Sequence, residues 1–291
     1  MSEPDFLSRA QIAILGLGLM GGSLALALQG RCRALLASDP DEDTVTLART
    51  RKIVDRISPD PAPILAEADV IILAAPIHEI LMLIEKIPKW HPGGAIVLDL
   101  GSTKRWITQA LEKMPARFDP IGGHPMCGKE TGGLIQAQGD LFEGATFAFT
   151  PLSRTSQKAR SLAEDLARAT GSRTLWLDAA THDRWVAATS HLPYIVASAL
   201  TLATPSDAVE LTGPGFRSTT RVAATPSSIM LDVLATNREN LFESLGRFRE
   251  QLDRLEERLK QEKFTELKAS LDKGAFLQRE LSSGRNERQG K

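Results

Sequence analysis

The amino-acid sequence predicts an α/β fold, with a doubly wound parallel sheet in its N-terminal part and an all-α C-terminal part. Three observations support this prediction: apolar strands alternate regularly with helices, a glycine motif follows the first strand, and strand signals end after residue 177. We therefore expect one domain at residues 1–177 and a helical domain at residues 178–281. Residues 282–291 are polar and lack periodicity, so we expect a disordered tail there.

The glycine motif lies between an expected strand and an expected helix. Residues 12–15 form an apolar run without a polar break, as in a strand buried on both faces. The motif G-L-G-L-M-G follows, with Gly16, Gly18 and Gly21, and residues 23–28 favour a helix. Gly16 would permit the tight turn, Gly18 the close approach of a pyrophosphate, and Gly21 close helix packing. A glycine-rich turn without a ligand is the alternative, but the flanking strand and helix favour a Rossmann-type dinucleotide site.

An acidic residue follows the second expected strand, at residues 34–38. Asp39 would accept hydrogen bonds from an adenosine ribose and would repel a 2′-phosphate. No basic residue occurs between Asp39 and Ala48, although the small hydroxyl of Ser38 is able to contact a phosphate. The sequence therefore predicts NAD as the cofactor, with NADP less favoured. The residues expected to contact the cofactor are Gly16, Gly18, Leu19, Met20, Gly21, Asp39, Ala75, Pro76 and Ser102.

The remaining elements continue the alternation. Short apolar runs predict further strands at residues 53–57, 70–74, 95–100, 118–122, 146–150 and 174–177. Helical patterns occur between them at residues 41–51, 77–87, 102–114 and 154–169, and prolines mark a loop at 58–63. In the C-terminal part we expect helices at 182–202 and 227–271, with an irregular interval at 203–225.

The C-terminal helical stretch carries one apolar stripe on a surface otherwise rich in charge. The stripe has the three- and four-residue spacing of one helix face. It consists of Leu241, Leu245, Phe248, Leu252, Leu255 and Leu259. Such a stripe must be buried within the chain or against another subunit. Because it is long for a domain of this size, we expect a homodimer formed through the C-terminal helices.

Composition excludes several classes of partner. The 291 residues carry 35 basic and 36 acidic side chains, so no strong field favours nucleic acid or an anionic membrane surface. The N-terminal ten residues do not resemble a signal sequence, and we find no apolar run long enough to span a bilayer. Cys32 and Cys127 lie far apart without metal-ligand spacing. We therefore expect a cytoplasmic protein with reduced thiols and no metal site.

Three polar residues are candidates for chemistry. Ligands of open α/β sheets bind beyond the carboxyl ends of the strands. Ser102 follows one such strand, although a serine there is alternatively the N-cap of the next helix. His124 follows another strand and would be a base near neutral pH, unless it is a surface or structural histidine. His191 precedes Pro193 inside an expected helix, where the proline makes a tolerated kink or places His191 over the cofactor.

Five motifs together resemble one enzyme family. In chain order they are G-L-G-L-M-G, D-L-G-S-T-K, G-G-H-P-M, S-H-L-P and G-F-R-S-T-T-R. From about Gln11 to about Leu271 the chain resembles the prephenate/arogenate dehydrogenase family of tyrosine biosynthesis. The resemblance implies an oxidative decarboxylation of prephenate or arogenate. A hydride would leave ring carbon 4 for the nicotinamide, and loss of CO₂ would make the ring aromatic.

The resemblance also implies roles for particular residues. His124 matches the histidine that takes the proton of the C4 hydroxyl, and Ser102 the serine near that histidine and the nicotinamide. His191 matches a second active-site histidine. Arg221 matches the arginine that binds a substrate carboxylate, and Glu130 a glutamate at the pocket mouth of some members. A guanidinium fork suits a carboxylate substrate better than a lysine does.

The sequence differs from the family pattern at some positions, and two other functions are alternatives. Arg217, the other arginine of its motif, is a second candidate for the substrate contact. Ser218 stands where many members carry Asp, and Met230 where some carry a Trp near the substrate ring. These differences concern substrate contacts and not the reaction type. The alternatives are a Rossmann-type dehydrogenase of a 3-hydroxy acid and a non-catalytic sensor of NAD(H).

Overall fold

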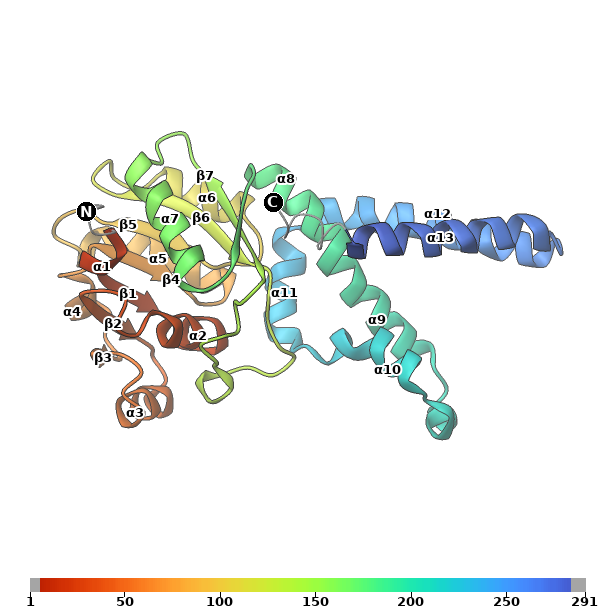
Figure 1. Ribbon diagram of the computed structural model, residues 1–291, viewed down its shortest axis with the longest axis horizontal. Helices are drawn as coiled ribbons and strands as arrows, with labels where there is room; N and C mark the ends of the chain where they lie inside the picture. Colours follow the sequence, from red (N-terminus) through yellow and green to blue (C-terminus); the bar gives the residue numbers. More distant parts are fainter. Residues whose placement is uncertain (1–5, 284–291) are drawn as a thin grey trace. The chain divides into compact units, whose positions relative to one another are not determined.

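The computed structural model describes residues 6–283 (Figure 1). The chain forms two compact units, Met1–Asn240 and Leu241–Lys291. This division falls later than the domain boundary expected after residue 177, and that boundary stays a prediction. Of the expected tail, residues 282 and 283 end the last helix, whereas residues 284–291 lie outside the described residues.

The first unit contains one eight-stranded sheet with the order β3-β2-β1-β4-β5-β6-β7-β8. Its strands are β1 (Gln11–Leu15), β2 (Ala34–Ser38), β3 (Arg56–Ser58), β4 (Val70–Leu73), β5 (Ile96–Asp99), β6 (Asp119–Pro125), β7 (Thr146–Pro151) and β8 (Arg173–Trp176). Strands β1 to β6 are parallel, in the order of a Rossmann-type sheet. The expected doubly wound parallel sheet is confirmed over β1 to β6, and it is followed by one antiparallel pairing, of β7 with β6. Strand β8 then runs parallel to β7.

Helices cover both faces of this sheet (Figure 1). They are α1 (Phe6–Arg9), α2 (Leu19–Leu28), α3 (Glu42–Thr50), α4 (Ala62–Leu65), α5 (Ile77–Trp90), α6 (Arg105–Glu112), the 3₁₀ turn η1 (Leu134–Gln136) and α7 (Gln157–Ala169). Side chains of β1 alternate between two cores: Ile12 and Ile14 join one, and Ala13 and Leu15 the other. Burial on both faces explains why this strand is apolar throughout.

Several element limits differ from the expectation. The loop expected at 58–63 contains the start of α4, and α5 continues through Pro88 to Trp90. Strand β6 extends to Pro125, so His124 lies within a strand and not in a following loop. Helix α6 begins at Arg105 and not at Ser102. Its first backbone N–H groups bind the carboxylate of Asp183, a partner that sequence spacing cannot reveal.

The first unit continues as helices. They are α8 (Ala179–Val186), the π-helical turn η2 (Ala187–His191), α9 (Leu192–Ala203), the 3₁₀ turn η3 (Ser206–Leu211), α10 (Pro214–Thr220), the 3₁₀ turn η4 (Arg221–Ala224) and α11 (Ser227–Thr236). The interval expected to be irregular therefore contains one helix and two 3₁₀ turns. The helix expected over 182–202 is confirmed, with a π turn directly before Leu192 and Pro193.

One helical run among residues 6–283, Ala179–Ala203, is long and apolar enough by composition to cross a membrane. The expectation that no apolar run is long enough to span a bilayer was therefore wrong for this helix. Near its N-terminus, His182 and Asp183 make hydrogen bonds to residues of β6 and of the α6 N-terminus. We therefore interpret the run as a helix of the folded unit.

Two helices remain, α12 (Arg238–Lys260) and α13 (Phe264–Ser283). The single helix expected over 227–271 is therefore three helices. Within the second unit, Arg258 of α12 lies beside Glu266 and Ser270 of α13, so the two helices form a hairpin (Figure 1). Glu262, with a φ of 55°, adopts the left-handed conformation in the turn between them.

Candidate active site

The glycine loop between β1 and α2 has the geometry that its sequence predicts. Gly16 has a φ of +95°, and a Cβ atom there would lie 2.6 Å from the carbonyl oxygen of Ala74. A Cβ atom at Gly21 would lie 1.9 Å from the oxygen of Gly16, so helix and loop pack too closely for a side chain. At Gly18 no heavy atom lies within 4 Å of the same position. Gly18, the N-cap of α2, therefore leaves open space where a dinucleotide phosphate would lie.

Asp39 lies against this loop. Its Oδ2 atom accepts a hydrogen bond of 2.7 Å from the backbone N–H of Leu17, and its Oδ1 atom one of 3.0 Å from Asp41. A carboxylate has further lone pairs, so these contacts leave capacity for a ribose hydroxyl. Ser38 is buried, and its hydroxyl donates to the carbonyl of Pro59 at 3.4 Å, so it already has a partner within the chain. The residues present thus fit a dinucleotide.

The other expected cofactor contacts lie near the same edge of the sheet. Leu19 and Met20 form the first turn of α2 and are half-buried. Ala75 and Pro76 follow β4, and Pro76 is the N-cap residue of α5. Ser102 is half-buried in the segment between β5 and α6. It is not the N-cap of α6, a position that Lys104 occupies, so the alternative interpretation of Ser102 was wrong.

A buried ion pair fixes the segment that follows β5. The side chains of Asp99 and Lys104 are completely buried and contact each other. Lys104 Nζ also donates to the carbonyl of Gly123 at 2.6 Å, which attaches this segment to β6. The backbone N–H of Gly101 donates to Asp99 Oδ2 at 2.8 Å. Burial raises the pKa of Asp99 and lowers that of Lys104, while the ion pair opposes both shifts.

His124 is half-buried in β6, directly after Gly123. Its Nδ1 atom lies 2.9 Å from Nε2 of His182, and the two rings meet edge to face with centroids 5.1 Å apart. The pKa of His124 is well below its usual value, first because burial disfavours the charged ring. His182 when it is protonated, the positive charge of Lys104, and His191 when it is protonated lower this pKa further. The imidazole is therefore neutral, as a base must be.

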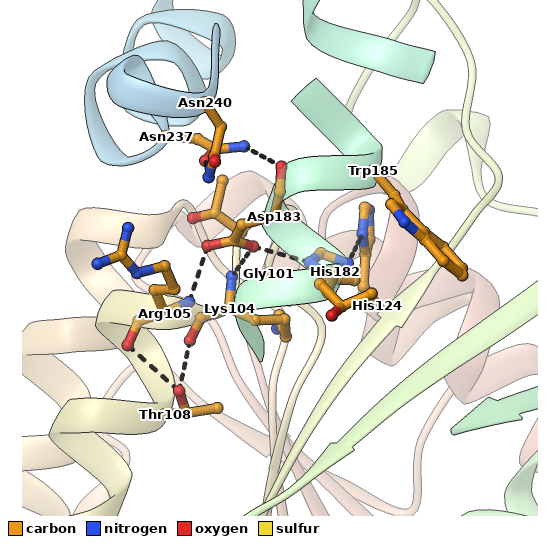
Figure 2. Close-up of polar contacts among 12 residues, drawn as sticks. Gly101, Lys104, Arg105, Thr108, His124, His182, Asp183, Trp185, Asn237 and Asn240 are labelled. Atoms are coloured by element: carbon orange, nitrogen blue, oxygen red, sulfur yellow. Dashed lines mark hydrogen bonds and ion pairs between the residues drawn. The ribbon is translucent and has the colours of Figure 1, made fainter. Parts of the chain in front are cut away.

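His182 and Asp183, in α8, are candidate site residues that sequence reasoning missed (Figure 2). His182 Nδ1 lies 2.8 Å from Asp183 Oδ1, and both side chains are buried. Asp183 Oδ1 also accepts the backbone N–H of Lys104 at 2.7 Å, and Oδ2 that of Arg105 at 2.9 Å. Burial lowers the pKa of His182, although its hydrogen bond to Asp183 opposes the shift. Their one sequence signal is a polar pair in the first helix after the last strand.

His191 lies deeper in the helical part. It ends the π turn, is 1% exposed, and its Nδ1 atom lies 3.2 Å from Asn237 Nδ2. Asn237 also donates to the backbone oxygen of Asp183 at 2.7 Å. His191 is therefore connected, through Asn237, to the residue that binds His182. Burial lowers the pKa of His191 to about 4, with the charge of Asp183 opposing the shift and that of His182 adding to it. The π turn, with its extra residue, stands where Pro193 interrupts regular α-helical bonding.

The expected substrate contacts form a separate pair. Glu130, after β6, makes an ion pair with Arg221 at the start of η4. The side chains are 33% and 63% exposed, so the pair is open to solvent. Arg217 is exposed on α10, and among residues 6–283 it has no ion pair. The structure thus joins Glu130 to Arg221 and His124 to His182, whereas Ser102 and Arg217 have no hydrogen bond to either pair within this range.

Two family models match the chain. The prephenate dehydrogenase nucleotide-binding domain matches residues 24–175, and the prephenate dehydrogenase dimerization domain matches residues 178–273. The prephenate dehydrogenase of Lactococcus lactis is 34% identical over 256 residues, which cover 84% of this chain and 70% of the relative.

Solved structures agree. A prephenate dehydrogenase from Aquifex aeolicus, in complex with hydroxyphenyl propionate and NAD⁺, is 26% identical with a TM-score of 0.87. That match covers 95% of this chain and 100% of the other. The Synechocystis arogenate dehydrogenase is 30% identical with a TM-score of 0.80, over 93% of this chain and 99% of the other. With a nucleotide-binding fold, a histidine site and both domain models in place, the chain belongs to the prephenate dehydrogenase family.

Proposed function

We propose that this dehydrogenase oxidises and decarboxylates prephenate, or its amino analogue arogenate, with NAD as hydride acceptor and His124 as the base. The observation that carries the proposal is the neutral, half-buried ring of His124 in β6, in the same unit as the glycine loop. A neutral imidazole is able to take a hydroxyl proton, and a dehydrogenation of an alcohol needs such a base. Family membership supports the reaction class.

One base is enough to account for every proton that moves in the proposed reaction. Bound NAD supplies the acceptor for the hydride of ring carbon 4. His124 removes the proton of the C4 hydroxyl as the carbon–hydrogen bond breaks, so the alcohol becomes a carbonyl. Cleavage of the bond to the ring carboxylate then releases CO₂ and leaves its electron pair in the aromatic ring. The protonated His124 returns its proton to the oxygen, which becomes the phenol of the product. Ser102 and His191 would position the reacting groups.

Selection of NAD over NADP would come from Asp39. Its carboxylate is held against the loop by Leu17 and Asp41 N–H groups, so it cannot easily swing away from a 2′-phosphate. The burial of Ser38 removes the hydroxyl that is able to favour NADP. We assign the cofactor contacts to the loop glycines, Leu19, Met20, Asp39, Ala75, Pro76 and Ser102.

Arg221 would bind a carboxylate of the substrate. It is paired with Glu130, and a substrate carboxylate would replace this partner or share the guanidinium fork with it. Arg217 lies on α10, one helical turn before Arg221, and is the second candidate.

We also propose a cytoplasmic homodimer formed through the C-terminal helices. Of the apolar stripe on α12, Leu241 is buried, whereas Leu252 and Leu259 are more than half exposed. Phe264 and Leu271 of α13 are equally exposed. A second copy of these helices would cover this surface, in agreement with the dimerization-domain match over residues 178–273. If light scattering at micromolar protein concentration gave the mass of a monomer, the proposed dimer would be contradicted.

One assay tests the proposed function. Purified protein is given NAD and either prephenate or arogenate, and the absorbance of the reduced cofactor is followed. Growth of this absorbance with release of CO₂ supports the proposal, and the ratio of the two rates identifies the substrate. Turnover of a 3-hydroxy acid alone would favour the alternative dehydrogenase. Cofactor binding without turnover of any of these substrates would identify a sensor of NAD(H).

A further inference from the structure

Three side chains stand in a row: the proposed base His124, then His182, then Asp183 (Figure 2). The two hydrogen bonds that join them measure 2.9 and 2.8 Å. His182 and Asp183 are 2% and 0% exposed, so water does not replace either contact. The first bond joins β6 to α8, and the second lies within α8.

The direction of each hydrogen bond follows from the partners of Asp183. Both of its oxygens accept backbone N–H groups, from Lys104 and from Arg105, which fixes the carboxylate in one orientation. A carboxylate only accepts, so the proton shared with His182 is on its Nδ1 atom. A neutral imidazole has one N–H group, and Nε2 of His182 is therefore an acceptor. It accepts from Nδ1 of His124, whose own Nε2 atom is left without a proton.

We propose that His182 and Asp183 are positioning residues that hold His124 as its Nδ1–H tautomer and leave Nε2 free to accept the substrate proton. This inference rests on the proposed function of His124 as the base. In the reaction the O–H bond of the C4 hydroxyl breaks and an N–H bond forms on Nε2. His124 then carries two N–H groups, and the one on Nδ1 stays bonded to His182. The same proton leaves Nε2 for the phenol oxygen after loss of CO₂.

The row also compensates the charge that appears on His124. Burial and the positive charge of Lys104 oppose formation of an imidazolium, and His191 opposes it as well when protonated. Asp99 neutralises much of the Lys104 charge through their buried ion pair. Asp183 adds a negative charge on the other side of His182, in line with the developing positive charge. Such a carboxylate behind a histidine fixes both the orientation and the tautomer of the ring.

A purely structural role is the competing interpretation, since Asp183 also binds the N-terminus of α6. Two variants of His182 separate the roles without touching Asp183. In His182→Gln an amide oxygen stands near the position of Nε2 and accepts from His124. In His182→Leu no acceptor remains. Glutamine cannot carry a proton onward, so its variant also tests whether His182 passes protons or only accepts a hydrogen bond.

The experiment combines NMR with kinetics. In protein labelled with ¹⁵N-histidine, long-range correlations report which ring nitrogen is protonated, and the chain has only five histidines. The signals of His124 are assigned by their loss in His124→Asn. We expect the Nδ1–H tautomer in the wild type and in His182→Gln, and its loss in His182→Leu. We also expect kcat to fall by at least about 10²-fold in His182→Leu, since a base in the wrong tautomer can lose about 10⁴-fold.

The same variants define the contrary results. His182→Gln should keep kcat within about tenfold of the wild type and the same Kd for NAD, because the acceptor is restored. A wild-type His124 protonated at Nε2 would overturn the proposal, as would a His182→Leu enzyme with wild-type kcat. The wild-type spectrum decides the matter even if His182→Leu does not fold. A protein with the expected tautomer but no turnover of prephenate or arogenate would refute the proposed function and not the hydrogen-bond network.

Discussion

Nδ1 of His124 lies 2.9 Å from Nε2 of His182, although 58 residues separate the two in the chain. This contact joins the last parallel strand of the sheet to the first helix of the helical part. The backbone of β6 is fixed on both sides by β5 and β7. The ring of His124 is therefore positioned by its own strand and by its hydrogen bond to α8. The proposed base is thus positioned by two parts of the fold at once.

The glycine loop predicts opposite outcomes for two alanine variants. Gly21→Ala places a methyl group 1.9 Å from a backbone oxygen, so it should destabilise the protein by about 1–3 kcal/mol or more. Gly18→Ala meets open space and should change stability by less than about 1 kcal/mol, yet raise the Kd of NAD at least about tenfold. Thermal unfolding and NAD titration measure both effects. A Gly18→Ala protein that binds NAD normally would contradict the proposed position of the pyrophosphate.

Asp39→Asn should reduce the preference for NAD. The wild type should have a higher kcat/KM with NAD than with NADP, since a second negative charge beside Asp39 costs about 1–4 kcal/mol. Removal of the charge should narrow this ratio by about tenfold or more. Asp41→Asn is the control, because it removes a nearby charge that binds Thr44 and not the loop. An equal effect of both variants would mean that Asp39 does not contact the ribose.

Arg221→Ala should mainly raise KM. A hydrogen bond to a charged group contributes about 1.5–3 kcal/mol in ground and transition states alike, which predicts a KM about 10- to 100-fold higher. Arg217→Ala removes an exposed arginine of the same segment and should have little effect. Steady-state kinetics with the preferred substrate compare the two. The reverse pattern would identify Arg217 as the substrate contact.

The buried His191 should make stability depend on pH. Its pKa is about 4 in the folded protein and about 6.5 when unfolded, so only the unfolded chain binds a proton between these values. The contribution of the neutral His191 to the free energy of unfolding is therefore full above pH 6.5. As the pH falls toward 4, the free energy of unfolding decreases by about 3 kcal/mol. His191→Asn should flatten this decline, whereas the exposed His78→Asn should not. Urea unfolding from pH 7 to pH 4 tests the difference, and parallel declines in all three proteins would contradict it.

Local sequence signals predicted most of the sheet. The strand at residues 34–38 has its expected limits, because a run of apolar residues between a turn and Asp39 is short and sharply bounded. Gly16 and Gly21 have the tight turn and the close packing expected of them, and Gly18 faces open space, since each environment is set by the β1–α2 turn itself. The antiparallel pairing of β7 was not foreseen, because strand direction depends on the long connection after Pro125.

The site was predicted only in part. His124 was chosen as a candidate because it was expected to follow a strand, whereas His182 and Asp183 gave no periodic or spacing signal. They belong to the candidate site because they contact His124 and Lys104, which lie 58 and 79 positions away in the chain. No local sequence pattern encodes such contacts. The start of α6 was misplaced for the same reason, since its N-terminus is bound by the side chain of Asp183 and not by Ser102.

The pH dependence of His124 variants tests the central claim most directly. Since burial and nearby positive charge lower the pKa of His124, kcat/KM of the wild type should fall only below pH 6.5 as the pH decreases. His124→Asn should lower kcat by ~10²–10⁴-fold, keep the Kd for NAD and lose this acidic limb. His191→Asn should cost less and keep the limb. A His124→Asn enzyme with near-normal kcat, or with an unchanged acidic limb, would show that the proton goes elsewhere.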